Sequence, residues 1–172
     1  MAALRKVKMQ NAKDTFYTTL QGRLAALNPA RTIVLRGLTR PGTLVDENEL
    51  PTAFVPMDAF RLQWTRLHVD SASPLPWIAM ECSVAYATDG SAGNGGMDRG
   101  RAMAAMDAEL AAALAQPPHA VPKMNYAATP PVAMATNISW ADPEFGEVKT
   151  LDERLTRTAT VQVFACQEAG EL

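Results

Sequence analysis

The strongest constraint on the fold is a period of two in the side chains of two long segments, residues 58–69 and 78–86, where large apolar residues alternate with polar or small ones. A period of two places the apolar side chains of a β-strand on one face, so both segments are predicted strands with one buried face. Residues 71–76 between them are rich in turn-forming types and predict a hairpin. The same alternation recurs over residues 132–140 and 155–166, which predicts two more long strands.

Two other segments have the spacing of amphipathic helices. Apolar residues recur every three to four positions before Asn28-Pro29, which predicts a first helix of about four turns. An alanine-rich segment, residues 102–115, has the same spacing and stops before Pro117-Pro118, which predicts a second helix. The first helix is defined by Phe16, Leu20, Leu24 and Leu27, and the second by Met103, Met106, Leu110 and Leu114.

These elements, with a short β-branched strand over residues 32–36, predict one α+β domain spanning residues 11–172. Hairpin-joined strands favour a mainly antiparallel sheet, which we expect to contain four to six strands packed by two helices. Residues 1–10 form a basic N-terminal arm in this prediction. Residues 89–96, with four glycines, predict a flexible loop, and the charged residues 142–153 predict a loop that projects from the sheet.

Composition excludes several classes of function. Apolar residues make up 48% of the chain and the formal net charge is −2, so the chain is globular and has no general attraction to nucleic acid. Cys82 and Cys166 lie in apolar strand-like segments and are expected to be free thiols. With no secretory signal and no 18-residue apolar segment, we expect neither export nor a membrane location.

Catalytic and ligand-binding motifs are absent from the sequence. The glycine-rich loop does not match a dinucleotide or phosphate-binding motif, and His68, His119 and the two cysteines lack metal-ligand spacing. The acidic residues Asp46, Glu47 and Glu49 are the remaining candidates for acid–base or metal chemistry. Exposed acids are usually solvated or salt-bridged, so we expect no enzymatic activity, no cofactor and no metal.

The residues around this acidic turn carry a resemblance to a known family. Arg40-Pro41, Leu44-Val45, Asp46-Glu47 and Leu50-Pro51 follow one another between the first predicted helix and the first long strand. This order resembles that of the tail terminator proteins of long-tailed bacteriophages, the family that includes the lambda minor tail protein U. The resemblance continues with a strand pair, a helix and two closing strands, which correspond to residues 61–86, 97–115, 132–140 and 155–166.

The resemblance implies a structural virion protein of the tail or neck, assembled in the host cytoplasm. Such a protein forms a ring, usually a hexamer, that caps the tail tube, stops its polymerisation and offers the docking surface for the head. Its implied partners are the tail tube protein and a head–tail connector or neck protein, and DNA only passes through the lumen.

For the contacts between subunits, we expect Asp46, Glu47 and Glu49 to meet Arg99 and Arg101 of the next copy, and we place Arg40 in the same interface. Two alternatives stay open. One is another neck or head–tail connector protein of the same virion, and the other is a small enzyme that uses the acidic loop 46–49.

Overall fold

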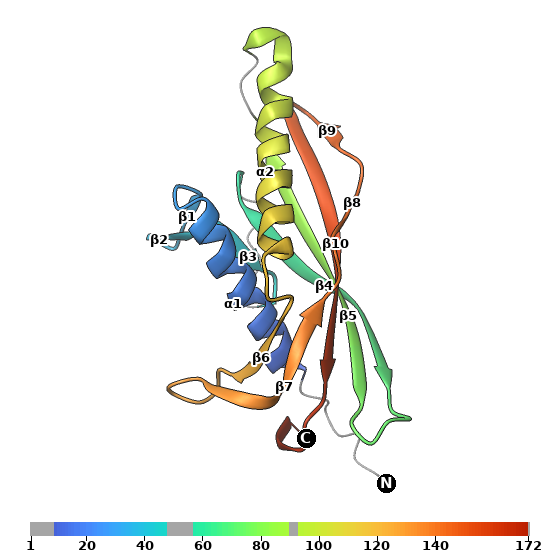
Figure 1. Ribbon diagram of the computed structural model, residues 1–172. Coiled ribbons are helices and arrows are strands. Elements are labelled where there is room, and N and C mark those ends of the chain that lie inside the picture. Colours follow the sequence, from blue (N-terminus) through green and yellow to red (C-terminus); the bar gives the residue numbers. More distant parts are fainter. Residues whose placement is uncertain (1–8, 48–56, 90–92, 172) are drawn as a thin grey trace.

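The computed structural model describes residues 9–47, 57–89 and 93–171 (Figure 1). Two α-helices and ten β-strands form within these residues. The helices are α1 (Gln10–Leu27) and α2 (Met97–Ala115); the strands are β1 (Thr32–Leu35), β2 (Leu38–Pro41), β3 (Thr43–Val45), β4 (Phe60–Asp70), β5 (Trp77–Thr88), β6 (Ala120–Asn125), β7 (Val132–Trp140), β8 (Glu144–Phe145), β9 (Lys149–Leu151) and β10 (Arg154–Cys166). Short 3₁₀ helices span Asn94–Gly96 and Ala169–Glu171.

Strand β10 is the centre of the main sheet, whose order is β3-β4-β5-β10-β7-β6. It pairs with β5 from Leu155↔Thr88 to Cys166↔Trp77, along almost its whole length. Its other side is shared, because β7 pairs with residues 163–165 while β8 and β9 pair with residues nearer its start. All pairings in this sheet are antiparallel except that of β3 with β4.

The predicted alternation is confirmed in the central strands. Val84 lies opposite Ala159 and Cys82 opposite Val161, and all four side chains are buried. Burial of one face by alternating apolar side chains is what fixes the register of such a pair, because a slip by one residue would expose the whole set.

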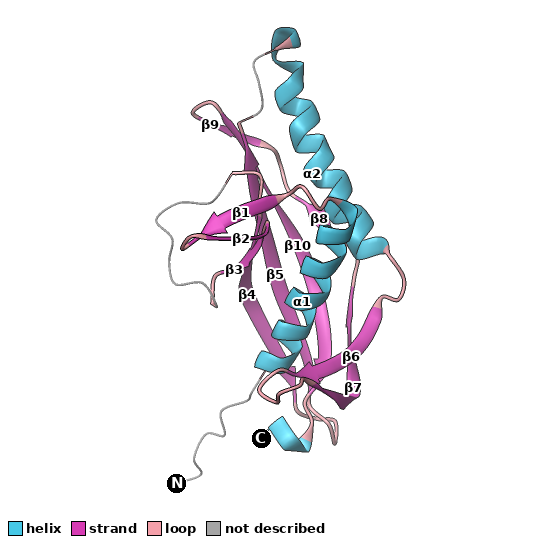
Figure 2. Cartoon of the chain, turned by 90° about the vertical axis from the view of Figure 1, so that its left-hand side faces the viewer, coloured by secondary structure: helices cyan, strands magenta, loops and turns pink. Residues whose placement is uncertain are grey.

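Both helices cover the same face of the sheet, and the other face has no helix in the described part of the chain (Figure 2). Phe16 on α1 packs edge-on against the rings of Trp64 and Trp140, so that Trp140 lies in the core and Trp64 packs against it. The remaining core side chains of the helices are Ala12, Leu20, Leu24, Met103, Met106, Leu110, Ala113 and Leu114. Both predicted helices therefore exist, and α2 begins before its alanine-rich part.

A second, small core lies under the β1–β2 hairpin, which forms a two-stranded sheet of its own. Ile33 and Leu44 are its main buried side chains. The two strands are joined by Arg36 and Gly37, whose φ angles of 50° and 79° are those of a two-residue hairpin turn with both residues left-handed. The hairpin extends sideways from the body of the molecule (Figure 1).

The α+β class with two helices and a mostly antiparallel sheet agrees with the prediction, but four to six strands was too low a number. The main sheet has eight strands, because β3 and β6 join its edges and β8 and β9 pair with β10. Residues 142–153 are therefore not a loop that simply projects from the sheet, since they contain β8 and β9.

Two other predicted segments are described only in part. In the N-terminal arm, residues 1–8 lie outside the described residues, and Gln10 already belongs to α1. In the glycine-rich loop, residues 90–92 lie outside them, and residues 94–96 form a 3₁₀ turn that leads into α2. Within residues 9–47, 57–89 and 93–171, neither helix has the length and hydropathy needed to cross a membrane.

Candidate functional site

Asp46, a predicted subunit contact, already has a partner within the chain. Strand β3 runs parallel to β4 and ends at Val45, so that Asp46 follows beside Arg61. The Arg61 guanidinium donates two hydrogen bonds to the Asp46 carboxylate, from Nε and, over 3.0 Å, from Nη2. This hydrogen bond raises the pKa of Arg61. A two-point pair of this kind fixes both side chains.

The other predicted contact residues are spread over the molecule. Glu47 Oε1 accepts a hydrogen bond of 2.7 Å from Lys13 Nζ at the start of α1. Arg101 Nη1 lies 3.3 Å from Asp98 Oδ1 at the start of α2, and Arg99 Nε is buried without a hydrogen-bond partner among the described residues. Arg40 lies in β2 opposite Ile33, and Glu49 lies outside the described residues.

Within one chain, the acidic turn and the two arginines of α2 are far apart. Glu47 lies beside the start of α1, whereas Arg99 and Arg101 lie at the free end of α2, at the top of Figure 1. The structure therefore does not bring them together, and their contact between two copies stays a prediction. The ion pairs of Asp46 and Glu47 would compete with it.

The acidic turn does not form a recognisable catalytic centre in the described residues. No group of three His, Cys, Asp or Glu side chains in residues 9–47, 57–89 and 93–171 is placed to hold a metal ion. His119 Nε2 lies 2.7 Å from the carbonyl oxygen of Ala115, at the end of α2. His68 lies on the exposed half of β4.

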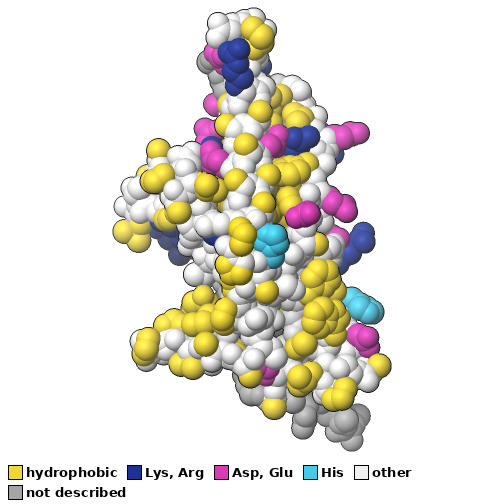
Figure 3. Space-filling model, viewed as in Figure 1, with side chains coloured by type: hydrophobic (Ala, Val, Ile, Leu, Met, Phe, Trp, Pro, Cys, Tyr) yellow, Lys and Arg dark blue, Asp and Glu magenta, His cyan; other side chains and the backbone are white. Residues whose placement is uncertain are grey.

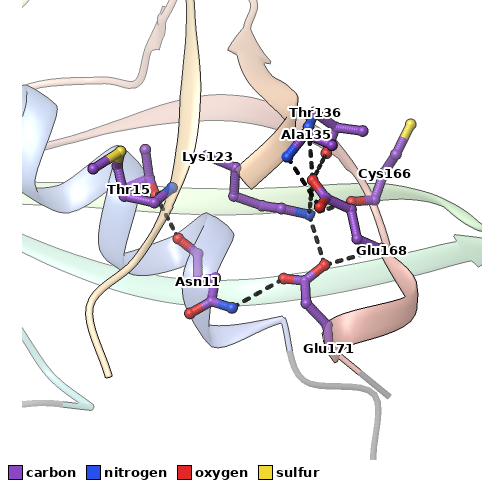
Figure 4. A network of polar contacts seen from close by, with 9 residues as sticks. Asn11, Thr15, Lys123, Ala135, Thr136, Cys166, Glu168 and Glu171 are labelled. Carbon is purple, nitrogen blue, oxygen red and sulfur yellow. Dashed lines mark hydrogen bonds and ion pairs between the residues drawn. The ribbon is translucent and has the colours of Figure 1, made fainter. Parts of the chain in front are cut away.

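Among the described residues, the most buried charged group is Lys123 on β6, which no motif in the sequence indicates (Figure 4). Its side chain is only 1% exposed. Nζ donates hydrogen bonds of 2.6 Å to Glu171 Oε2 and 2.5 Å to the carbonyl oxygen of Cys166, and it lies 3.6 Å from Glu168 Oε1. A buried ammonium is stable only with such partners.

The two glutamates extend this network from β6 to two other elements, β7 and α1. Glu168 accepts hydrogen bonds from the backbone N–H groups of Ala135 and Thr136 and from the Thr136 hydroxyl on β7. Partial burial raises the pKa of Glu168, but these hydrogen bonds outweigh it and the pKa is lowered overall. Glu171 accepts a hydrogen bond from the side-chain amide of Asn11 on α1. The network therefore fastens residues 166–171 to α1, β6 and β7.

A second polar cluster joins α2 to the sheet. The Tyr86 hydroxyl and Arg157 Nη1 each donate a hydrogen bond of 2.5 Å to the Asp107 carboxylate. Burial, together with the hydrogen bond and charge of Asp107, raises the pKa of Tyr86, so that its hydroxyl remains a donor. Beside this cluster is a cavity of about 310 Å³, lined mainly by apolar atoms, and Leu151 is one of its lining residues.

A third cluster holds the base of the β1–β2 hairpin against α2. Arg31 donates two hydrogen bonds of 2.7 Å to the Glu109 carboxylate, which also accepts one of 2.9 Å from the Asn28 amide. Partial burial raises the pKa of Glu109, but the hydrogen bonds of Arg31 and Asn28 outweigh it, so the pKa is lowered. The direction in which the hairpin extends is thus fixed.

Large apolar side chains are exposed at several ends of the molecule (Figure 3). They lie on the β1–β2 hairpin, near the β4–β5 turn, at the start of α2 and β7, and around β9. These side chains are Val34, Leu38, Leu67, Leu75, Trp77, Met97, Val132, Val148 and Leu151. Exposed apolar side chains that gather on projecting elements indicate surfaces for protein contact.

Compared with known proteins, the chain matches no family model and no curated protein sequence. The polar clusters described above stabilise the fold, whereas the exposed apolar ends and charged edges are available to partners. These exposed ends and edges are therefore the candidate functional surface of the described residues.

Proposed function

We propose that this protein is a tail terminator of a long-tailed bacteriophage, which forms a ring that caps the tail tube, stops its polymerisation and provides the head-docking surface. The order of sequence features over nearly the whole chain supports the proposal. In this proposal the protein binds the tail tube protein on one side and a connector or neck protein on the other.

The observation that carries the proposal is the one-sided packing of the sheet. Helices cover one face, while the helix-free face is formed by partly exposed polar and small side chains such as Gln63, Ser83 and Thr160. Glu81 on this face accepts hydrogen bonds from Thr65 and Gln162, which ties neighbouring strands together. A sheet of this kind suits a ring subunit, because one face packs the core and the other is free to border a lumen or a neighbour.

The surface charge also fits a ring through which DNA passes. The formal net charge is −2, and on the helix-free face the exposed Arg66 has a carboxylate of opposite sign, Glu81, 3.8 Å away. Contacts between basic side chains and phosphates are the dominant source of affinity for DNA. A surface without an excess of basic side chains makes few of them, so DNA can pass without being held.

Tail assembly with and without the protein tests the proposal. Purified tail tube protein is allowed to polymerise alone and with this protein, and tube lengths are measured by electron microscopy. We expect tubes of defined length with a ring at one end when the protein is present, and overlong tubes without it.

Two results would contradict the proposal. Tubes of unchanged length with no bound ring would exclude a terminator, and a ring bound at the head vertex but not at the tube would indicate a connector or neck protein. The variant Asp46→Asn tests the enzyme alternative. If the acidic loop is a catalytic site, the variant particle should assemble correctly but lose activity.

A further inference from the structure

We propose that neighbouring copies are joined by the β1–β2 hairpin of one copy and the edge formed by residues 142–153 of the next, an inference that rests on the proposed ring. We call residues 142–153 the acidic edge. The occupant of the acidic edge is therefore a second copy of this chain, and the chemistry of the two surfaces supports the match.

The two surfaces lie on opposite edges of the same half of the sheet. Strand β10 pairs with β5 on one side, so β8 and β9 must lie on its other side. The hairpin lies at the β3 end of the strand order, on the left of Figure 1, and β8 and β9 lie on the right. A contact between two different surfaces on opposite edges is head-to-tail, which is the type that closes into rings.

Each surface exposes large apolar side chains. On the hairpin, Val34 is 68% and Leu38 is 70% exposed. On the acidic edge, Leu151 is 64% exposed and lines the apolar cavity of about 310 Å³, and Val148 is also exposed. Burying these side chains against each other would contribute about 25 cal/mol for each Å² of apolar surface removed from water.

The two surfaces also have opposite charges. Residues 29–45 contain no acidic residue; of their three arginines, Arg31 is paired with Glu109 on α2, whereas Arg36 at the hairpin turn is exposed. The acidic edge contains five carboxylates and one lysine, a formal charge of −4. Its carboxylates, all exposed, make no hydrogen bond or ion pair with the described residues; they are Asp142, Glu144, Glu147, Asp152 and Glu153. Figure 3 shows the acidic side chains gathered on the right, over β8 and β9.

Both surfaces are held rigidly before any contact forms. The base of the hairpin is fixed by Arg31, which binds Glu109 on α2. The acidic edge is fixed by Arg157, whose Nε donates a hydrogen bond of 2.7 Å to the Gly146 carbonyl oxygen and whose guanidinium lies over the Phe145 ring. Preorganised surfaces lose little conformational entropy on association.

Charge reversal at the two surfaces tests this inference. The variants are Arg36→Glu, the double variant Glu147→Arg/Glu153→Arg, their combination, and Leu38→Asp. Arg66→Glu is the matched control, because Arg66 is exposed on the helix-free face of β4 and away from both surfaces. Association is measured by sedimentation velocity over a range of protein concentrations, and circular dichroism checks that each variant is folded.

We expect Arg36→Glu, the double variant and Leu38→Asp each to raise the concentration needed for ring assembly at least about tenfold, because the same contact recurs around the ring. The combined charge reversal should restore assembly, and Arg66→Glu should assemble like the unchanged protein. Normal rings in Arg36→Glu and Leu38→Asp would overturn the inference while leaving the proposed function intact.

Two further results separate the partners and the two proposals. Normal rings that no longer bind the tail tube would show that the hairpin contacts the tube, and would also overturn the inference. An unchanged protein that forms no ring at any concentration, alone or on tubes, would overturn the proposed function itself.

Discussion

Replacing Lys123 by methionine tests the buried network in the most direct way. Methionine has a similar length and is apolar, so the change removes the ammonium while leaving little empty space. Glu171, only 2% exposed, would keep its carboxylate but lose the hydrogen bond of 2.6 Å from Lys123 Nζ. The Cys166 carbonyl oxygen would lose its donor as well.

The size of the effect follows from what remains buried. Removing one partner of a buried ion pair leaves an uncompensated charge and typically costs about 3–5 kcal/mol. Glu171 retains the hydrogen bonds of the Asn11 amide and the Glu168 backbone N–H, so its charge is only partly compensated. We therefore expect Lys123→Met to lower the free energy of unfolding by about 3–5 kcal/mol.

The double variant Lys123→Met/Glu171→Gln separates charge from packing. It removes both charges, so it should be less destabilised than the sum of the two single variants, with a coupling energy of up to about 3 kcal/mol. Unfolding in urea is followed by tryptophan fluorescence, at a protein concentration below that of any ring assembly. Lys149→Met is the control, because Lys149 is exposed and should change stability by less than about 0.5 kcal/mol.

Two outcomes would refute this reasoning. A loss of less than about 1 kcal/mol in Lys123→Met would mean that the ammonium is not the group that compensates the buried carboxylates, since the expected range starts well above it. Strictly additive effects in the double variant would mean that Lys123 and Glu171 do not interact.

Three other predictions concern separate parts of the chain. Because the pKa of Glu109 is lowered, its contribution to stability is present above the ordinary carboxyl pKa and is lost as pH falls through the lowered value. The Glu109→Gln variant has no such carboxylate, so its melting temperature should fall less than that of the unchanged protein when the pH is lowered below about 5. A Cβ at Gly146 would lie 2.8 Å from a carbonyl oxygen of β10, so Gly146→Ala should destabilise the protein by about 1–3 kcal/mol in urea unfolding. Gly22 lies in α1 with open space around it, so Gly22→Ala should stabilise the protein by up to about 1 kcal/mol in the same assay. Burial raises the pKa of Cys82 to about 12, so a thiol reagent at pH 8 should label it only on unfolding, with the less buried Cys166 reacting faster.

The long strands could be predicted from sequence because one physical rule decides them. In β5 and β10, alternate residues are apolar and buried, so the sequence period and the burial agree. Strand β3 lacks an alternating pattern. It is only three residues long, and all three of its residues, Thr43, Leu44 and Val45, are buried. The short charged strands β8 and β9 have no periodicity to read.

Strand β6 was missed for a reason that also explains why Lys123 was overlooked. The inward position of this strand is Lys123, and the strand contains Pro122, so its pattern contradicts the rule that apolar residues face the core. The partners that allow a lysine there, Glu168 and Glu171, are more than forty residues away along the chain. A pattern within one segment cannot reveal a burial that depends on such distant groups.

The same limit applies to the proposed contact surface. The arginines of residues 29–45 and the carboxylates of residues 142–153 are each visible in the sequence as local charge. Their positions on opposite edges depend on the thirteen residues of β10, which pair with β7 at one end and with β8 and β9 at the other. A shorter central strand would leave the acidic segment unpaired and free to move. The length of β10 therefore both extends the core and presents a fixed acidic edge, and acidic side chains on such an edge oppose indiscriminate strand pairing while favouring a basic partner.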